Sequence, residues 1–155
     1  MFNLKKILKL SVVICMIAAS SYAAAGSLAF KKGLSSNKSA DCNSGTDFCV
    51  HIMADNSIPS NPPFYVSAYF SYIVDGTTYS EPYVNSINQY TYISMSAPIS
   101  EIKRVNATEV SIGVSQAGGQ SLTNCVVKET GSQIVAGIHT LMISKASGKV
   151  TCSVQ

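Results

Sequence analysis

Cysteine and histidine are the side chains best suited to chemistry here, and the 155-residue sequence holds five cysteines and two histidines. Cys15 lies in an apolar stretch near the N-terminus, which leaves an even set of four: Cys42, Cys49, Cys125 and Cys152. An even number of cysteines in an exported chain indicates disulfides rather than free thiols. Of the three possible pairings we favour Cys42–Cys49, which closes a loop around Asn43-Ser44-Gly45, and Cys125–Cys152, which joins two late strands.

Metal binding is not expected from the spacing of these residues. A structural zinc site uses a Cys-x-x-Cys motif or a pair of histidines a few residues apart, and neither motif occurs. The sequence therefore predicts no metal ion and no other cofactor.

No motif in the sequence predicts a catalytic residue. Gly-x-Ser-x-Gly, a Walker loop and His-Glu-x-x-His are all missing. A cysteine held in a disulfide has no thiolate for nucleophilic attack. The two histidines are His51 and His139, and we expect both to be structural. A small secreted hydrolase stays open as an alternative, which requires one of them beside a carboxylate and a Ser or Thr in one pocket.

Tyrosine is the most unevenly distributed residue, since seven of the eight tyrosines lie between positions 65 and 92. Tyr65 and Tyr69 alternate with small polar residues, on the serine-bearing face of their segment. Tyrosine among small polar side chains makes a contact surface of low entropic cost. We therefore predict that Tyr65 and Tyr69, together with Tyr83, contribute to a binding patch for a protein or a glycan. The alternative is that these rings only cover a sheet.

The elements that must position these side chains have a two-residue period. Residues 64–74 have a two-residue period that predicts a strand with one buried face. One face holds Phe64, Val66, Ala68, Phe70, Tyr72 and Val74, and the other holds Tyr65, Ser67, Tyr69, Ser71 and Ile73. Asp75-Gly76 follows, and this pair favours a two-residue hairpin turn. In that register Val74 lies opposite Thr77, and Tyr72 lies opposite Tyr79.

Similar patterns predict short strands along the rest of the chain. They are expected at 48–54, 64–74, 77–80, 89–95, 109–115, 122–128, 134–144 and 149–154. Segment 134–144 is apolar enough for a buried helix, but its β-branched residues favour a strand. Residues 98–104 suggest a connection or one helical turn. The fold class is therefore all-β: an antiparallel β-sandwich, Ig-like or similar, of about seven or eight strands, with a small β-barrel as the second choice.

The N-terminus has the features of a cleaved signal peptide over residues 1–25. Three lysines precede a short apolar run, and small residues follow it. That run is too short to span a bilayer, so no membrane anchor is expected after cleavage. Residues 26–41 are expected to be a flexible leader, mostly loop, although Leu28, Phe30 and Leu34 also suit a short helix or an edge strand. Residues 42–155 are expected to form a single disulfide-stabilised β domain.

Charge argues against a nucleic-acid partner. The net charge of +3 comes entirely from Lys5, Lys6 and Lys9, and the remainder has eight basic and eight acidic residues. Together these features predict a protein exported by a bacterial Sec-type route to the periplasm or the medium. We expect it to act by surface recognition rather than catalysis. A secreted enzyme inhibitor, using the 59–63 loop or the 42–49 loop, is a further alternative.

Overall fold

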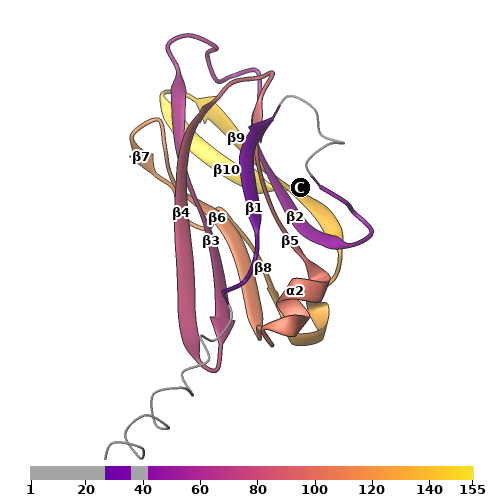
Figure 1. Cartoon of the computed structure of the whole chain (residues 1–155). Coiled ribbons are helices and arrows are strands. Elements are labelled where there is room, and N and C mark those ends of the chain that lie inside the picture. The colour runs from indigo at the N-terminus through magenta and orange to yellow at the C-terminus, as the bar shows by residue number, and fades with distance from the viewer. Residues whose placement is uncertain (1–26, 36–41) are drawn as a thin grey trace, which may run out of the picture.

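A computed structural model of the chain describes residues 27–35 and 42–155. The predicted signal peptide, 1–25, lies outside the described residues. Strands make up 60% of the structure and helices 7%, so the fold is all-β. Two sheets face each other across a common core, as Figure 1 shows. This arrangement is a β-sandwich, as the sequence predicts.

The first sheet has five strands in the order β1-β5-β2-β9-β10. Their bounds are β1 Lys31–Ser35, β2 Asp47–Ala54, β5 Tyr92–Pro98, β9 Gly137–Ala146 and β10 Lys149–Val154. The second sheet has the order β4-β3-β6-β7, and β8 also pairs with β6. Its strands are β3 Phe64–Val74, β4 Thr77–Ile87, β6 Glu109–Ala117, β7 Gln120–Ser121 and β8 Val126–Thr130.

One pair of strands departs from the expected antiparallel arrangement. β2 and β9 pair in parallel, with Phe48 opposite Gly137 and Ala54 opposite Ile143, whereas the other paired strands are antiparallel. β9 reaches β2 after the chain has passed through the second sheet. No hairpin turn therefore sets its direction relative to β2. The sequence carries no local signal for this pairing.

The β3–β4 hairpin confirms the predicted turn and register. Asp75 and Gly76 have φ values of 49° and 75°, the left-handed conformation that a two-residue turn of this kind requires. Val74 lies opposite Thr77, and Tyr72 lies opposite Tyr79. The rings of Tyr72 and Tyr79 stack with centroids 5.0 Å apart on the inner face.

β4 is longer than predicted, because the sequence indicated a strand only over 77–80. Pro82, in the middle of β4, lies opposite Tyr69. Counting from the closing pair Val74–Thr77, this is a non-hydrogen-bonded position, so the proline nitrogen points toward the free edge of the sheet. The strand therefore passes through the proline without losing a bond to β3.

The core lies between the two sheets and is closed at one end by a short helix. Its largest fully buried side chains include Phe48, Phe70, Ile52, Ile93, Met95, Ile112 and Leu141. Helix α2, Ile99–Arg104, buries Ile102 against this core, which confirms the helical turn expected there. A 3-10 turn, η1, spans Gly131–Gln133 before β9, and the segment 134–144 contributes a strand rather than a helix.

Residues 31–35 form strand β1, although the 26–41 segment was expected to be mostly loop. Leu28 is buried, and the Phe30 ring stacks on Phe70 with centroids 4.5 Å apart. Lys32 Nζ lies 3.4 Å from a carboxylate oxygen of Glu81 on β4. The apolar contacts of Leu28 and Phe30 hold the segment against the core. Residues 31–35 therefore form an edge strand, which was the alternative expected for this segment.

Neither helix among the described residues, α2 or η1, has the length and apolar character needed to cross a bilayer.

Two disulfides cross-link the sandwich, and they join Cys42 to Cys49 and Cys125 to Cys152. These are the two pairs favoured from the sequence.

Candidate functional site: the Tyr65 pocket

The pocket that contains a predicted site residue lies at the end of the sandwich opposite α2. We call it the Tyr65 pocket, and its volume is about 420 Å³. Three segments line it: the loop between β2 and β3 with the start of β3, the β6–β7 turn, and the end of β9. Its lining residues are Pro59, Pro62, Pro63, Phe64, Tyr65, Gly118, Gly119 and Lys145. This volume falls at the lower end of the range for small-molecule sites.

The proline-rich loop is fixed to β9 by a network centred on Asp55. The Asp55 carboxylate accepts hydrogen bonds from the hydroxyl groups of Ser144 and Ser57, and the Asp55 N–H donates to the carbonyl of Ile143 at 2.9 Å. The Ser144 hydroxyl, followed by that of Ser57, lowers the pKa of Asp55 below its ordinary value. The Lys145 N–H donates to Ser57 Oγ at 2.6 Å. These hydrogen bonds hold the loop that lines one wall of the pocket against β9.

The β6–β7 turn forms the opposite wall and depends on glycine. Gly118 and Gly119 have φ values of 54° and 79°. A Cβ at Gly118 would lie 2.4 Å from the Phe64 ring, so the ring packs directly on the backbone of the turn. The Gly118 N–H also donates to the Tyr65 carbonyl at 2.8 Å, which holds the turn beside the tyrosine.

Tyr65 is the prominent exposed group at this site. Its side chain is 60% exposed. It lies opposite Ser86, while Val84, the next outward residue of β4 and itself 61% exposed, lies opposite Ser67. Diagonal neighbours of this kind are within reach of each other on a sheet face. The second sheet therefore presents an exposed apolar surface that continues from the pocket.

Tyr69 lies on the same outer face but is only half-buried cover for the sheet. It lies opposite Pro82 on β4 and Gly113 on β6. A Cβ at Gly113 would lie 2.5 Å from Tyr69 Oη and 2.8 Å from the Cys125 carbonyl oxygen. The tyrosine ring thus fills the space that a larger residue would need. We call Tyr65, Tyr69, Pro82 and Val84 the outer patch.

Tyr83 is not part of the same surface. It lies opposite Ala68, a core residue, so its side chain is on the inner face of β4. Lys32 Nζ lies 5.7 Å from the centre of its ring. The structure therefore brings Tyr65 and Tyr69 together and separates Tyr83 from them. Tyr83 is four residues after Tyr79 on β4, so the two-residue period puts both on the inner face. This spacing was the signal in the sequence that could have separated Tyr83 from Tyr65 and Tyr69.

The lining of the Tyr65 pocket carries little charge. Lys145 is the one ionisable cation in its lining, and no acidic side chain of the described residues lines it. Neither His51 nor His139 lines it either. The pocket therefore lacks the histidine and carboxylate that the hydrolase alternative requires.

The two histidines pack elsewhere. His51 is 2% exposed on β2, and its ring lies 4.6 Å from that of Tyr92. His139 is half-buried, and its ring lies 5.6 Å from that of Phe48. Each histidine therefore contacts an aromatic ring outside the Tyr65 pocket.

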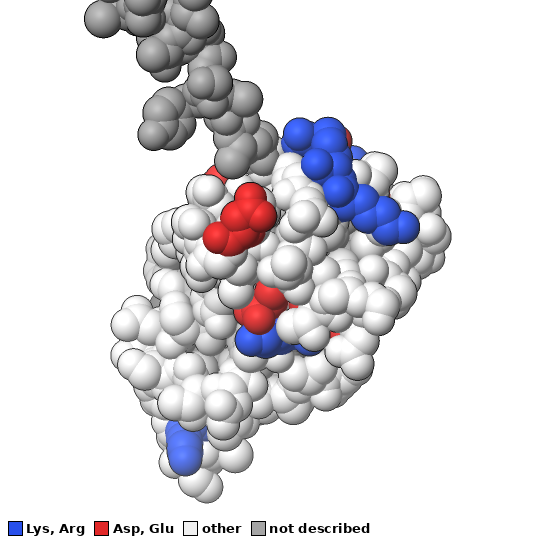
Figure 2. Space-filling view, turned by 90° about the horizontal axis from the view of Figure 1, so that it is seen from below, with Lys and Arg blue, Asp and Glu red and all other residues white. Residues whose placement is uncertain are grey.

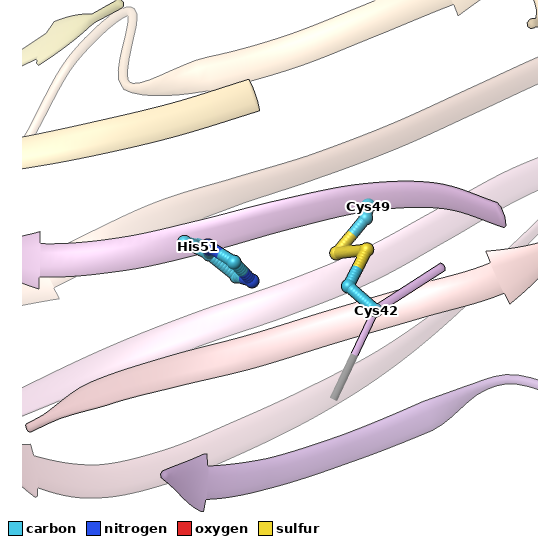
Figure 3. A group of neighbouring side chains, drawn as sticks. All are labelled: Cys42, Cys49 and His51. Carbon is cyan, nitrogen blue, oxygen red and sulfur yellow. A yellow bond between two sulfur atoms is a disulfide. The ribbon is translucent and has the colours of Figure 1, made fainter. Parts of the chain in front are cut away.

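His51 also belongs to a cluster that the sequence did not predict. Figure 3 shows His51 beside the Cys42–Cys49 disulfide. One ligand atom from each of the three residues lies within 4.8 Å of the others. Cys49 and His51 are two residues apart on β2, so they share one face of the strand. The disulfide then carries Cys42 to that face.

The opposite end of the molecule has a smaller pocket and a mixed surface. This pocket, of about 290 Å³, is bounded by Ile99, Ile102, Lys103, Asn106, Ala107, Gly131 and Ile134. Arg104 pairs with Glu101 at 2.8 Å within α2. Figure 2 shows this end largely uncharged, with separate basic and acidic groups rather than a broad basic surface.

Comparison with protein-family models, with curated proteins and with solved structures found no match. The function of this chain is therefore inferred from its own residues.

Proposed function

We propose that this chain is an exported, non-enzymatic β-sandwich protein that recognises a protein or glycan ligand through Tyr65. One observation carries the proposal. Tyr65 is 60% exposed, and it belongs both to the wall of the pocket and to the outer patch. An exposed tyrosine at the junction of a pocket and an apolar sheet face is suited to binding by contact.

Pre-organisation of the surroundings supports this function. Three prolines line the loop side of the pocket, and the Asp55 network holds that loop to β9. Gly118 and Gly119 bring backbone to the other side. A ligand that enters such a site orders few side chains, so little conformational entropy is lost on binding.

Export is supported by the cross-links. Disulfides persist in oxidising compartments, and this domain contains two of them. The lysine-rich start and the short apolar run of the sequence are typical of a signal peptide. We propose that the leader is removed and that the domain acts in the periplasm or the medium.

The two ligand classes would use different parts of this surface. A sugar ring would enter the pocket, stack against Tyr65 and receive a hydrogen bond from Lys145. A protein would cover the broader outer patch and bury Val84. Tyr65 is common to both modes, whereas Lys145 belongs only to the pocket and Val84 only to the patch.

The experiment is a binding screen with four single variants. The purified protein is applied to an array of bacterial and host glycans and, separately, to immobilised surface proteins, and each hit is measured by calorimetry. Tyr65→Ala is expected to weaken any hit by about tenfold or more, the effect of losing one anchor residue. Lys145→Gln weakens a glycan hit alone, and Val84→Ser a protein hit alone.

Tyr90→Ala is the matched control, because Tyr90 is 73% exposed but does not line the Tyr65 pocket. It is expected to leave every hit unchanged. A ligand whose affinity is insensitive to Tyr65→Ala would contradict the proposed site. Turnover of a bound glycan or peptide by the purified protein would contradict the non-enzymatic role.

A further inference from the structure

A second site, independent of the Tyr65 pocket, lies on the first sheet at the Cys42–Cys49 disulfide. Cys49 is fully buried, His51 is 2% exposed, and Cys42 is half-buried just before β2. One ligand atom of each residue lies within 4.8 Å of the others (Figure 3). Bond lengths of about 2.3 Å for Zn–S and 2.0–2.1 Å for Zn–N put the ligand atoms of a tetrahedral site about 3.5–3.8 Å apart. The three ligand atoms are therefore near enough to share one ion once the two sulfurs, now bonded to each other, have moved apart.

We propose that, when the Cys42–Cys49 disulfide is reduced, Cys42, Cys49 and His51 bind one Zn²⁺ ion. A dithiol reductant supplies the electrons: its two thiols become a disulfide, and the two cysteine sulfurs become thiols. Zn²⁺ then displaces one proton from each thiol and accepts the neutral imidazole as its third ligand. Water occupies the fourth position.

The chain before β2 keeps Cys42 at the site after the bond is broken. The N–H groups of Thr46 and Asp47 both donate to the Asn43 carbonyl, at 3.0 and 2.8 Å. The Asn43 N–H in turn lies 3.4 Å from an Asp47 carboxylate oxygen. This turn closes the loop without help from the disulfide. Cys49 is held within β2, which pairs with β5 on one side and β9 on the other, so Cys42 is the residue that moves to let the sulfurs separate.

A neighbouring hydroxyl supports the site. Ser96 on β5 lies directly opposite Cys49, so the two side chains share a face of the sheet. Its Oγ is fully buried and has no hydrogen-bond partner in the described part of the chain. A buried hydroxyl without a partner is costly. A Cys49 thiolate bound to zinc would accept a hydrogen bond from it, as outer groups do at metal sites.

Spacing alone did not reveal this site, because it combines Cys-x₆-Cys with a histidine two residues further on. The strand period puts Cys49 and His51 on one face, and the short loop returns Cys42 to it. The other disulfide, Cys125–Cys152, belongs to no metal-ligating cluster found among the described residues. It therefore provides a matched control.

The test is a metal titration of the purified protein in oxidised and reduced form. The protein is reduced with a phosphine, and Co²⁺ is titrated as a spectroscopic probe, followed by competition with Zn²⁺. Reduced wild type and the Cys125→Ser/Cys152→Ser variant are expected to bind one ion with a thiolate-to-cobalt charge-transfer band. The oxidised protein is expected to show no such band.

Two variants test the ligands. Cys42→Ser/Cys49→Ser is expected to abolish the band. His51→Ala should weaken Co²⁺ binding by more than about tenfold, because even outer-shell partners contribute about 10–100-fold. Circular dichroism of the oxidised His51→Ala protein checks its fold, and Cys42→Ser, which retains two ligands, replaces it if folding fails. A reduced wild type without the band, or equal affinity in the ligand variants, overturns the proposal.

Discussion

Replacing Gly113 by alanine tests how closely the outer face of the second sheet is packed. A Cβ at this position would lie 2.5 Å from Tyr69 Oη, 2.7 Å from Tyr69 Cζ and 2.8 Å from the Cys125 carbonyl oxygen. The tyrosine is half-buried, so its ring can rotate away. The carbonyl cannot, because it accepts a hydrogen bond from Val114 N at 2.8 Å and belongs to a disulfide-bonded residue.

The expected loss of folding free energy in Gly113→Ala comes mainly from the contact with the fixed Cys125 carbonyl rather than from the movable Tyr69 ring. Overpacking a fixed backbone typically costs about 1–3 kcal/mol, and we expect Gly113→Ala to fall near the middle of that range. For a domain of this size each kcal/mol corresponds to roughly 3–5 °C in Tm, so a cost of about 2 kcal/mol should lower Tm by roughly 6–10 °C. Thermal and urea unfolding of the disulfide-bonded protein measure both quantities.

Gly137→Ala is the matched control. Gly137 is the first residue of β9, and its φ is not positive. A Cβ there would meet nothing within 4 Å. Since glycine in a strand costs roughly 0.5–1 kcal/mol relative to alanine, this variant should be neutral or slightly more stable. Equal Tm values for the two alanine variants would refute the packing described for Gly113.

A double-variant cycle with Tyr69→Ala separates the two contacts. Removal of the ring relieves part of the clash, so Gly113→Ala should cost less in that background than in wild type. It should still cost something, because the Cys125 carbonyl remains. A coupling energy of zero would mean that the Tyr69 ring does not lie over Gly113, and Tyr69 would then be available for binding.

Two further outcomes are expected from stability measurements. Replacing Cys125 and Cys152 by alanine should destabilise the domain more than replacing Cys42 and Cys49, by about 3.6 against about 2.5 kcal/mol in the loop-entropy estimate, because the closed loop is longer (sequence separation 27 against 7). Urea unfolding that ranks the pairs in the opposite order would count against this account. The lowered pKa of Asp55 means that its carboxylate stabilises the fold above its unfolded pKa of 3.8, and this contribution is lost as pH falls through the lower folded value. The stability gap between wild type and Asp55→Asn, measured by urea unfolding across pH, should therefore be constant above that pKa and shrink in acid; a gap that widens in acid would contradict it.

Local patterns in the sequence were sufficient for much of the fold. The two-residue period of 64–74 and the Asp75-Gly76 pair predicted β3, the turn and the register of the hairpin, because side-chain period and turn chemistry act within a few residues. The parallel β2–β9 pair was not predictable in this way. It joins residues more than 80 positions apart, and no turn connects them.

In the candidate site, too, local sequence patterns predicted some features, and others depend on the tertiary fold. Alternation placed Tyr65 and Tyr69 on one face, and the structure agrees. Tyr83 was grouped with them although it is on the other face, because the extent of β4 past Ser80 was not recognised. The pocket itself combines three distant segments, so its lining depends on the tertiary fold. That Tyr69 covers Gly113 likewise follows only from the pairing of β3 with β6.

The proline in β4 has a consequence for how copies of this protein behave at high concentration. β4 is an eleven-residue strand at the end of its sheet, and a strand of that length is a template on which another chain can add. Pro82 removes one amide donor from the middle of the exposed ladder. Two molecules that meet along this side cannot form an unbroken set of bonds, so intermolecular strand addition and fibril growth from this edge are disfavoured.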